Sequence, residues 1–326
     1  MSPEQLPALP VYFVLTPGFL MLDLAGPAEA FRIASQLGGA FKLHLVAPTD
    51  KIMSSLGVSV GDLQPLPATL PANALVMLAG ATRSAEMYAL PEATQVVDWL
   101  KQVITPAHRL ACVCSAAQLA GKAGLLNGRR CTTHHTLIDR LKTIAPQAKV
   151  EDDRIFVQDG NVFTSAGITA GIDLALFLIE KLGGAALAQQ VARHMVVFLR
   201  RSGHDPQLSP WLEGRNHMHP AIHRVQDAIS QHPGRHWSLD ELADIACMSV
   251  RNLSRLFRQH TGVSVLDYQQ RLRIAYARQL VESTGLSIER ISEQAGFGSA
   301  RDFRRVWGKF EEAPPAMLRM QLVEAA

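Results

Sequence analysis

The sequence predicts an α/β protein, with a layered, mostly parallel sheet and flanking helices in a flavodoxin-like arrangement, followed by an all-α domain with two helix-turn-helix units. Three observations support this class. Short apolar runs alternate with helix-length amphipathic segments over the first two hundred residues, as expected when crossover helices join parallel strands. From Ala221 onward the segments are helical and rich in arginine, without a strand pattern, and one of them is repeated.

Composition sets the broad class of the protein. A chain of 326 residues, 48% hydrophobic and 19% charged, is long enough for two globular domains. No apolar run reaches the roughly 18 residues needed to span a bilayer, and no secretory signal is visible. Four cysteines without framework spacing indicate free thiols. We therefore expect a cytoplasmic protein with no membrane partner, and its net charge of +3 leaves a nucleic-acid partner open.

The first domain is expected to span residues 1–200. Its expected strands are VYFVL (11–15), FKLHLVA (41–47), ALVMLAG (74–80) and RLACV (109–113). Its expected helices cover residues 26–37, 92–104, 115–126, 167–184 and 185–201. Apolar residues at helical spacing support the last two. Together these elements predict a sheet covered by helices.

Cys114 falls at the turn between a buried strand and the helix that follows it. Binding sites in such sheets lie beyond the carboxyl ends of the strands. The positive end of a helix dipole favours a thiolate, so this layout is that of a nucleophile elbow. A buried structural cysteine is the alternative interpretation.

The stretch CSAAQLAGKAGLLNGRRCTTHH (114–135) resembles the elbow region of the PfpI-type, class I glutamine amidotransferase-like superfamily. PGFLMLDLAGPAEAF (17–31), NALVMLAGA (73–81) and the segments after residue 164 are similar to other motifs of that domain. The resemblance implies that Cys114 stands at the nucleophile position, His134 at the family histidine and Asp23 at the facing acid. It implies a ligand pocket formed by Asp23, Gly80, Ala81, Cys114, Ser115, His134 and His135.

Departures from the family pattern favour a pocket that binds a ligand without turnover. Ala116 stands where the family usually has glycine, His135 replaces an aromatic residue, and Ala81 replaces a second glycine. A cysteine-dependent hydrolase or hydratase is the alternative. We expect no catalytic residue and no cofactor.

A metal site is the other alternative for this stretch, because Cys112, Cys114, Cys131, His134 and His135 are all ligand types. Cys112 and Cys114, however, form C-x-C rather than the wider spacing of a zinc knuckle. The small-residue helix after them leaves no flexible loop to wrap an ion. We therefore expect no metal.

Residues 201–218 are expected to be a linker, because they are rich in Gly, Pro, Ser, Asn and His and lack periodicity. In the domain expected at 219–326, LADIACMSVRNLSRLF (242–257) is echoed by ISEQAGFGSARDFRRVW (291–307). Each copy has a short helix, a tight turn and a second helix opened by a serine, Ser249 or Ser299. This pattern predicts two helix-turn-helix units.

Arginines are concentrated on the second helix of each copy, away from its apolar stripe. Arginine suits bidentate recognition of guanine edges and phosphates. A solvated charged face is the alternative for either helix alone. The expected DNA-binding residues are Arg251, Ser254, Arg255, Arg301, Arg304 and Arg305.

Residues 239–307 resemble the AraC/XylS-type DNA-binding domain, and the fusion of this domain to an amidotransferase-like domain resembles the GlxA-type branch of that family. The resemblance implies a DNA-binding transcriptional regulator, an activator that works as a homodimer on promoter sites. Members that sense arginine, carnitine or glycine betaine imply a small nitrogenous effector, such as an amino acid or a quaternary amine. A DNA-packaging protein is a further alternative, disfavoured because it needs no sensor domain.

Overall fold

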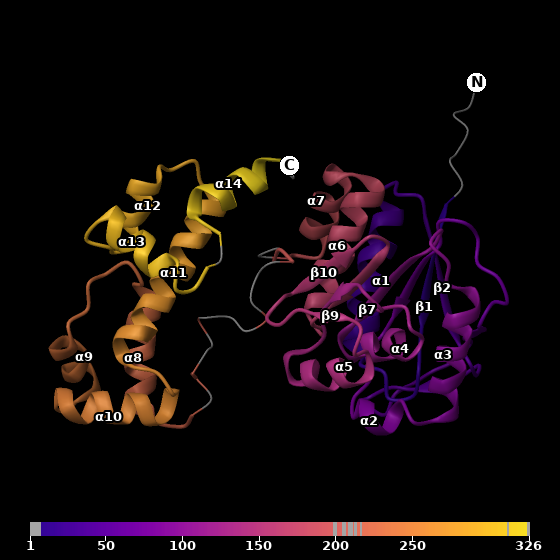
Figure 1. Ribbon diagram of the computed structural model, residues 1–326, viewed down its shortest axis with the longest axis horizontal. Helices are drawn as coiled ribbons and strands as arrows, with labels where there is room; N and C mark the ends of the chain where they lie inside the picture. The colour runs from indigo at the N-terminus through magenta and orange to yellow at the C-terminus, as the bar shows by residue number, and fades with distance from the viewer. Residues whose placement is uncertain are drawn as a thin grey trace. The chain divides into compact units, whose positions relative to one another are not determined.

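The computed structural model describes residues 8–197, 201–203, 207, 211, 214–215, 217–311 and 313–324. The chain divides into two compact units, Met1–Gln207 and Leu208–Ala326 (Figure 1). The expected linker at 201–218 lies partly outside the described residues. Over the described parts of the chain, no helix combines the length and the apolar character needed to cross a membrane.

The first unit is built on one large sheet. Its strands are β1 (Leu9–Val14), β2 (Phe41–Ala47), β5 (Gln64–Pro65), β6 (Leu75–Leu78), β7 (Arg109–Val113), β10 (Phe156–Asp159) and β11 (Val162–Ser165). Their order is β10-β11-β7-β6-β1-β2-β5, and every neighbouring pair is parallel except β10 with β11. The expected strands are β1, β2, β6 and β7, so the mostly parallel sheet is confirmed.

Helices cover both faces of this sheet (Figure 1). They are α1 (Met21–Gln36), α2 (Ser84–Met87), α3 (Pro91–Val103), α4 (Ala117–Lys122), α5 (Ile138–Ile144), α6 (Ala170–Gly183) and α7 (Ala185–His194). Because side chains alternate along a strand, Val11 and Phe13 join an apolar core with α1, α6 and α7. Tyr12 and Val14 join a second core with α3 and α4. Two short pairs, β3 (Ile52–Met53) with β4 (Ser59–Val60) and β8 (Arg130–Cys131) with β9 (Lys149–Val150), complete the unit.

Several helices differ from their expected bounds. α6 begins at Ala170 instead of residue 167. α7, expected over 185–201, ends at His194, before Val196 with its positive φ of 55°. α1 begins at Met21 instead of residue 26, and Pro27 lies inside it. Gly26 of this helix packs closely on α6, where a Cβ on Gly26 would lie 2.7 Å from Ile172. The elbow helix, expected over 115–126, is a 3₁₀ turn at Cys114–Ala116 followed by α4. It ends before Gly124, whose φ of 76° is incompatible with a helix.

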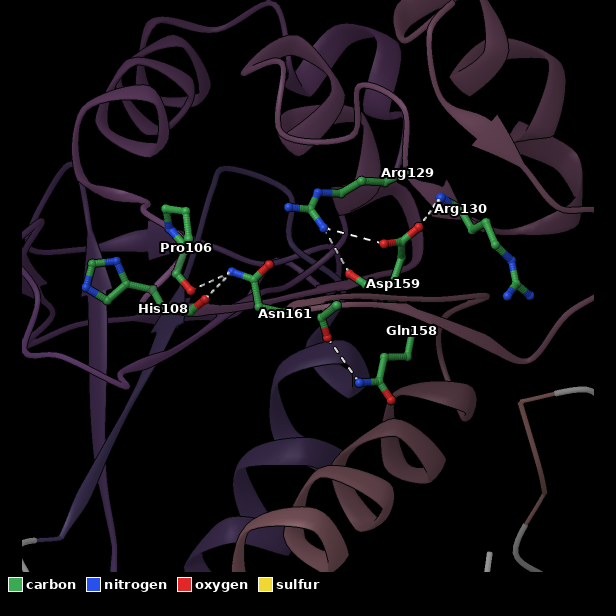
Figure 2. Close-up of polar contacts among 8 residues, drawn as sticks. Pro106, His108, Arg129, Arg130, Gln158, Asp159 and Asn161 are labelled. Carbon is green, nitrogen blue, oxygen red and sulfur yellow. Dashed lines mark hydrogen bonds and ion pairs between the residues drawn. The ribbon is translucent and has the colours of Figure 1, made fainter. Parts of the chain in front are cut away.

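Sequence reasoning missed the β10–β11 hairpin at the edge of the sheet. Asp159 pairs with Val162, which leaves Gly160 and Asn161 as a two-residue turn, and this Asp-Gly-Asn run was the available signal. Figure 2 shows how the turn is fixed: the Asn161 side chain donates to the carbonyls of Pro106 and His108. Arg129 and the Arg130 amide donate to Asp159. These contacts hold the hairpin against the start of β7, so that β11 ends beside Cys114.

The second unit is helical. Its described helices are α8 (Pro220–Gln231), α9 (Leu239–Ala246), α10 (Val250–Thr261), α11 (Val265–Ser283), α12 (Ile288–Gln294), α13 (Ala300–Trp307) and α14 (Pro315–Glu324). The long helix α11 contributes Tyr268 and Leu272 to one apolar core with α8, α9 and α10. It contributes Ile274 and Ala277 to another core with α12 and α13. The two predicted helix-turn-helix units are therefore confirmed as two small cores that share α11.

Close backbone contact joins these two halves. A Cβ on Gly234, between α8 and α9, would lie 2.1 Å from the Gln294 carbonyl oxygen. A Cβ on Gly296, in the turn after α12, would lie 2.2 Å from the Gly234 carbonyl oxygen. Arg273 of α11 is 9% exposed and donates to the Arg235 carbonyl. The turns of the two halves are thus in direct contact.

Candidate functional site

Cys114 is held in a strained conformation at the end of β7. Its φ is 58°, which is unusual for a residue with a Cβ and typical of functional turns. Two glycines allow the chain to pass close to it. A Cβ on Gly80 would lie 2.8 Å from the Cys114 Cβ, and one on Gly167 would lie 2.2 Å from it. Cys114 is only 4% exposed.

Asp23, near the start of α1, lies beside Cys114. A Cβ on Gly80 would lie 2.6 Å from the Asp23 Oδ2. The Asp23 carboxylate accepts hydrogen bonds from the Gly80 amide (3.2 Å) and the Ile168 amide (3.0 Å). Burial raises the pKa of Asp23 to about 6 although both amides lower it. At neutral pH this is therefore a buried carboxylate that is mostly ionised.

The Cys114 thiol is protonated at neutral pH, contrary to the thiolate expected from a helix N-terminus. Burial, and next the charge of Asp23, raise the pKa of Cys114 to about 12, whereas hydrogen bonds from the amides of Ser115 and Ile168 lower it. The helix that follows begins with a 3₁₀ turn and is only six residues long. Desolvation outweighs the field of so short a helix.

The expected pocket residues Ser115 and Ala81 are joined to each other. The Ser115 hydroxyl accepts from the Ala81 amide (2.8 Å) and donates to the Ala81 carbonyl (3.0 Å). Because the Ser115 hydroxyl proton is directed to Ala81, the Tyr88 hydroxyl donates to the Ser115 Oγ (3.1 Å), and Ser115 is fully buried. This network fixes the loop after β6 against the elbow, a role for Tyr88 that sequence reasoning missed.

The histidines lie nearer the surface. His134 is half-buried, His135 is exposed, and their rings are 4.4 Å apart. The His134 Nδ1 accepts from the Thr136 amide and contacts its hydroxyl, and burial lowers the pKa of His134. The preceding residue makes the contact with the elbow, because the Thr133 hydroxyl donates to the Cys114 carbonyl (2.8 Å). The structure thus brings Asp23 and Cys114 together. His134 follows Thr133, the residue whose side chain bonds directly to Cys114.

Three contact residues of the elbow were missed: Thr133, Gly167 and Ile168. The repeated threonines before the histidines and the glycine in SAGITAG were the available signals. Within the described residues, no three His, Cys, Asp or Glu side chains are placed to hold a metal ion.

The second unit carries the other candidate site. Ser249 opens α10 and Ser299 opens α13, and each side chain accepts an amide of its own first turn. Leu253 and Phe257 of α10 are buried, as are Phe303 and Trp307 of α13. Val306 of α13 is buried with them, so the apolar stripe of each helix faces its core. The expected DNA-binding residues Arg251, Ser254, Arg255, Arg301, Arg304 and Arg305 are all exposed.

Local partners hold three of these arginines. Arg255 donates to Asn252 within α10 (2.9 Å). Arg304 pairs with Glu289 at 3.3 Å, and Arg305 pairs with Asp302 at 2.6 Å. Exposed pairs of this kind contribute only about 0–1 kcal/mol, so the arginines can exchange their partners for phosphates or bases.

The comparisons with known proteins agree with this division. The model of the DJ-1/PfpI family matches residues 10–181, and the model of a helix-turn-helix domain matches residues 242–321. The HTH-type transcriptional regulator CdhR of Pseudomonas aeruginosa is 30% identical over 316 residues, which cover 95% of this chain and 91% of that protein. The HTH-type transcriptional regulator GlxA of Rhizobium meliloti is 27% identical over 319 residues, 94% of each chain.

An enzyme is also similar to part of the chain. The isonitrile hydratase of Pseudomonas putida is 35% identical over 189 residues, which cover 56% of this chain and 76% of the enzyme. Similarity to the regulators CdhR and GlxA therefore extends over nearly the whole chain, and similarity to the hydratase over about half of it.

Proposed function

Because the chain belongs to the DJ-1/PfpI family and carries an AraC-type helix-turn-helix domain, it is a transcriptional regulator of the GlxA type, and we propose that it binds promoter DNA through α10 and α13 in response to a small nitrogenous metabolite. The metabolite would bind at Asp23, Gly80, Ala81, Cys114, Ser115, His134 and His135. The proposal further includes action as an activator, in the cytoplasm, and as a homodimer.

The observation that carries the DNA-binding role is the match between two exposed arginine faces in one unit. Arg251 and Arg255 lie four residues apart on α10, and Arg301, Arg304 and Arg305 share the outward side of α13. In a helix-turn-helix unit, the second helix is the element that enters the major groove. Two such helices in one unit would contact two successive major grooves, about 10 bp apart.

Replacing Arg255 tests this assignment. On duplexes that the wild-type protein selects from genomic fragments, Arg255→Ala is expected to weaken binding by about 1–3 kcal/mol if the guanidinium contacts a base bidentately. Arg290→Ala is the matched control, because Arg290 is an exposed, ion-paired arginine outside α10 and α13. Equal losses of affinity for selected and random DNA would indicate that Arg255 contacts a phosphate and not a base. No loss would contradict the assignment.

The effector class is supported by the charge of the elbow site. Both hydrogen-bond partners of the Asp23 carboxylate are neutral amides, and a buried carboxylate is stabilised by a cation. An amino acid or a quaternary amine supplies a positively charged nitrogen. This chemistry agrees with the nitrogenous effectors that the family resemblance implies.

The similarity to isonitrile hydratase favours one competing function, catalysis at Cys114. Burial of Cys114 and its pKa of about 12 support a non-catalytic role, because the thiolate is the nucleophile. We expect Cys114→Ser to leave DNA binding intact and to alter, at most, the response to the effector. If the protein hydrolyses an amide or hydrates an isonitrile, and Cys114→Ser abolishes that rate, the protein is an enzyme.

A further inference from the structure

Two loops contact Cys114 directly. In one, Gly167 lies against the Cys114 side chain, and the amide of the next residue, Ile168, donates to Asp23. In the other, the Thr133 hydroxyl donates to the Cys114 carbonyl. The surroundings of Cys114 and Asp23, where we propose that the metabolite binds, therefore include both loops.

The first loop is bonded to the residue that opens the linker. Arg201 donates from its backbone amide to Asp173 Oδ1 (3.0 Å) and from its guanidinium to Asp173 Oδ2 (2.9 and 2.7 Å). It also donates to the Thr169 hydroxyl (2.8 Å), one residue after Ile168. Asp173 is 6% exposed, so removing Arg201 would leave a buried carboxylate without its charged partner. Two residues on, Gly203 packs against Phe156, where a Cβ would lie 2.6 Å from the carbonyl oxygen.

The second loop is bonded to another linker residue, Gln207. Its side-chain amide donates to the Thr133 carbonyl (2.9 Å) and is 3.4 Å from the Thr132 hydroxyl, and its backbone amide donates to Asp153 (2.8 Å). The Gln207 Oε1 is buried without a partner among the described residues. Such an acceptor is costly to leave unpaired.

We propose that Arg201 and Gln207, the linker anchors, are part of the sensing site and couple its occupancy to the linker. One anchor is bonded to each loop that contacts Cys114, so a ligand that shifts either loop changes how the start of the linker is held. The inference rests on the proposed sensing function of this site. Coupling of this kind is reciprocal: a change at the site alters the anchors, and a change at the anchors alters the site.

A change at the site tests the first direction without any effector. Gly167→Ala places a Cβ against Cys114, and Gly38→Ala is the matched control, because Gly38 has a similar φ (96° against 100°) and open space around it. In hydrogen exchange of the full chain, Gly167→Ala is expected to speed exchange in peptides covering 201–207 by about tenfold or more. Gly38→Ala is expected to leave those peptides unchanged.

A change at the anchors tests the second direction, and it decides the question if Gly167→Ala fails to fold. Arg201→Ala and Gln207→Ala are each expected to raise the rate of Cys114 alkylation by iodoacetamide by about tenfold, because the loops over the thiol open more often. Arg32→Ala, which removes an exposed ion pair of α1, is expected to have no effect. An unchanged alkylation rate in both anchor variants would overturn the proposal. Neither hydrogen exchange nor Cys114 alkylation involves DNA or an effector. Failure of this proposal can therefore be distinguished from failure of the proposed function, which is tested by DNA binding and effector binding.

Discussion

Cys114 illustrates how one side chain is controlled by its neighbours. The strained φ of 58° and the approach of Gly80 and Gly167 place the thiol where a nucleophile would stand. The same close approach excludes water and, with the charge of Asp23, stabilises the neutral thiol. Geometry and electrostatics therefore act in opposite directions at this residue, and electrostatics decides its protonation.

The thiol of Cys114 is expected to react slowly with alkylating agents. Its pKa of about 12, against an ordinary 9.0, lowers the thiolate fraction at pH 7 about a thousandfold. Cys247 is exposed in the same chain and is an internal reference. Mass spectrometry after iodoacetamide treatment should find Cys247 labelled long before Cys114. Equal rates would contradict the buried, neutral thiol.

Asp23 is expected to make effector binding depend on pH. A thermal-shift screen with L-arginine, L-carnitine and glycine betaine should identify a ligand that raises the melting temperature. Because the pKa of Asp23 is about 6, the affinity for a cationic ligand should fall by up to about tenfold per unit below pH 6. Asp23→Asn should bind weakly at every pH, and a pH-independent affinity in the wild type would exclude Asp23 as the partner.

Asp23 also makes the stability of the unliganded protein depend on pH, in the direction opposite to its effect on ligand binding. The pKa of Asp23 is raised from 3.8 to about 6 by folding, so the folded state binds the proton more tightly than the unfolded state. The contribution of Asp23 to stability is therefore fully present below about pH 4 and is lost as the pH rises through 6. Ligand binding and this contribution to stability respond to pH with opposite sign.

In the second unit, the two halves that carry α10 and α13 are joined by a shared helix and by close backbone contact. α10 and α13 belong to different apolar cores, but α11 runs through both. Gly234 and Gly296 bring the turns of the two halves into backbone contact. Because neither position has room for a Cβ, this contact and the shared α11 both restrict how the two halves are placed relative to each other.

Gly234→Ala is expected to destabilise the second unit by about 1–3 kcal/mol, because its Cβ would overlap the Gln294 carbonyl. Gly285→Ala is the matched control. Gly285 lies between α11 and α12 with no heavy atom within 4 Å of its Cβ position, so alanine there is expected to be neutral or stabilising by up to about 1 kcal/mol. Calorimetry of the full chain measures both. Equal melting curves for the two variants would refute the contact.

The whole molecule combines a sensing unit and a DNA-binding unit in one chain. Two arginine-bearing helices in each subunit would contact two grooves, and a two-fold dimer would double that number. Non-specific phosphate contacts add affinity that falls with salt concentration. Assembly therefore determines how much of a promoter one regulator covers.

We expect a homodimer that forms through the first unit. Light scattering of the full chain at micromolar concentration should give twice the chain mass of 35.6 kDa. Hydrogen exchange measured across a dilution series should locate the concentration-dependent protection within residues 8–197. A monomer at micromolar concentration, or protection confined to the second unit, would contradict this expectation.

The sequence by itself determined the features that depend on local order. The alternation of apolar runs predicted β1, β2, β6 and β7, and the repeat with its serine caps predicted α10 and α13 with their outward arginines, because periodicity and capping act over a few residues. The hairpin β10–β11 was missed although its turn signal was present.

Only the tertiary structure decided the chemistry of the elbow. The pKa of Cys114 depends on desolvation by segments far away in the chain, including Gly80 and Gly167. The contacts of Arg201 and Gln207 likewise join the linker to loops some 30 to 75 positions earlier. Burial and hydrogen bonding across such separations depend on how the whole unit packs, which no local pattern of residues contains.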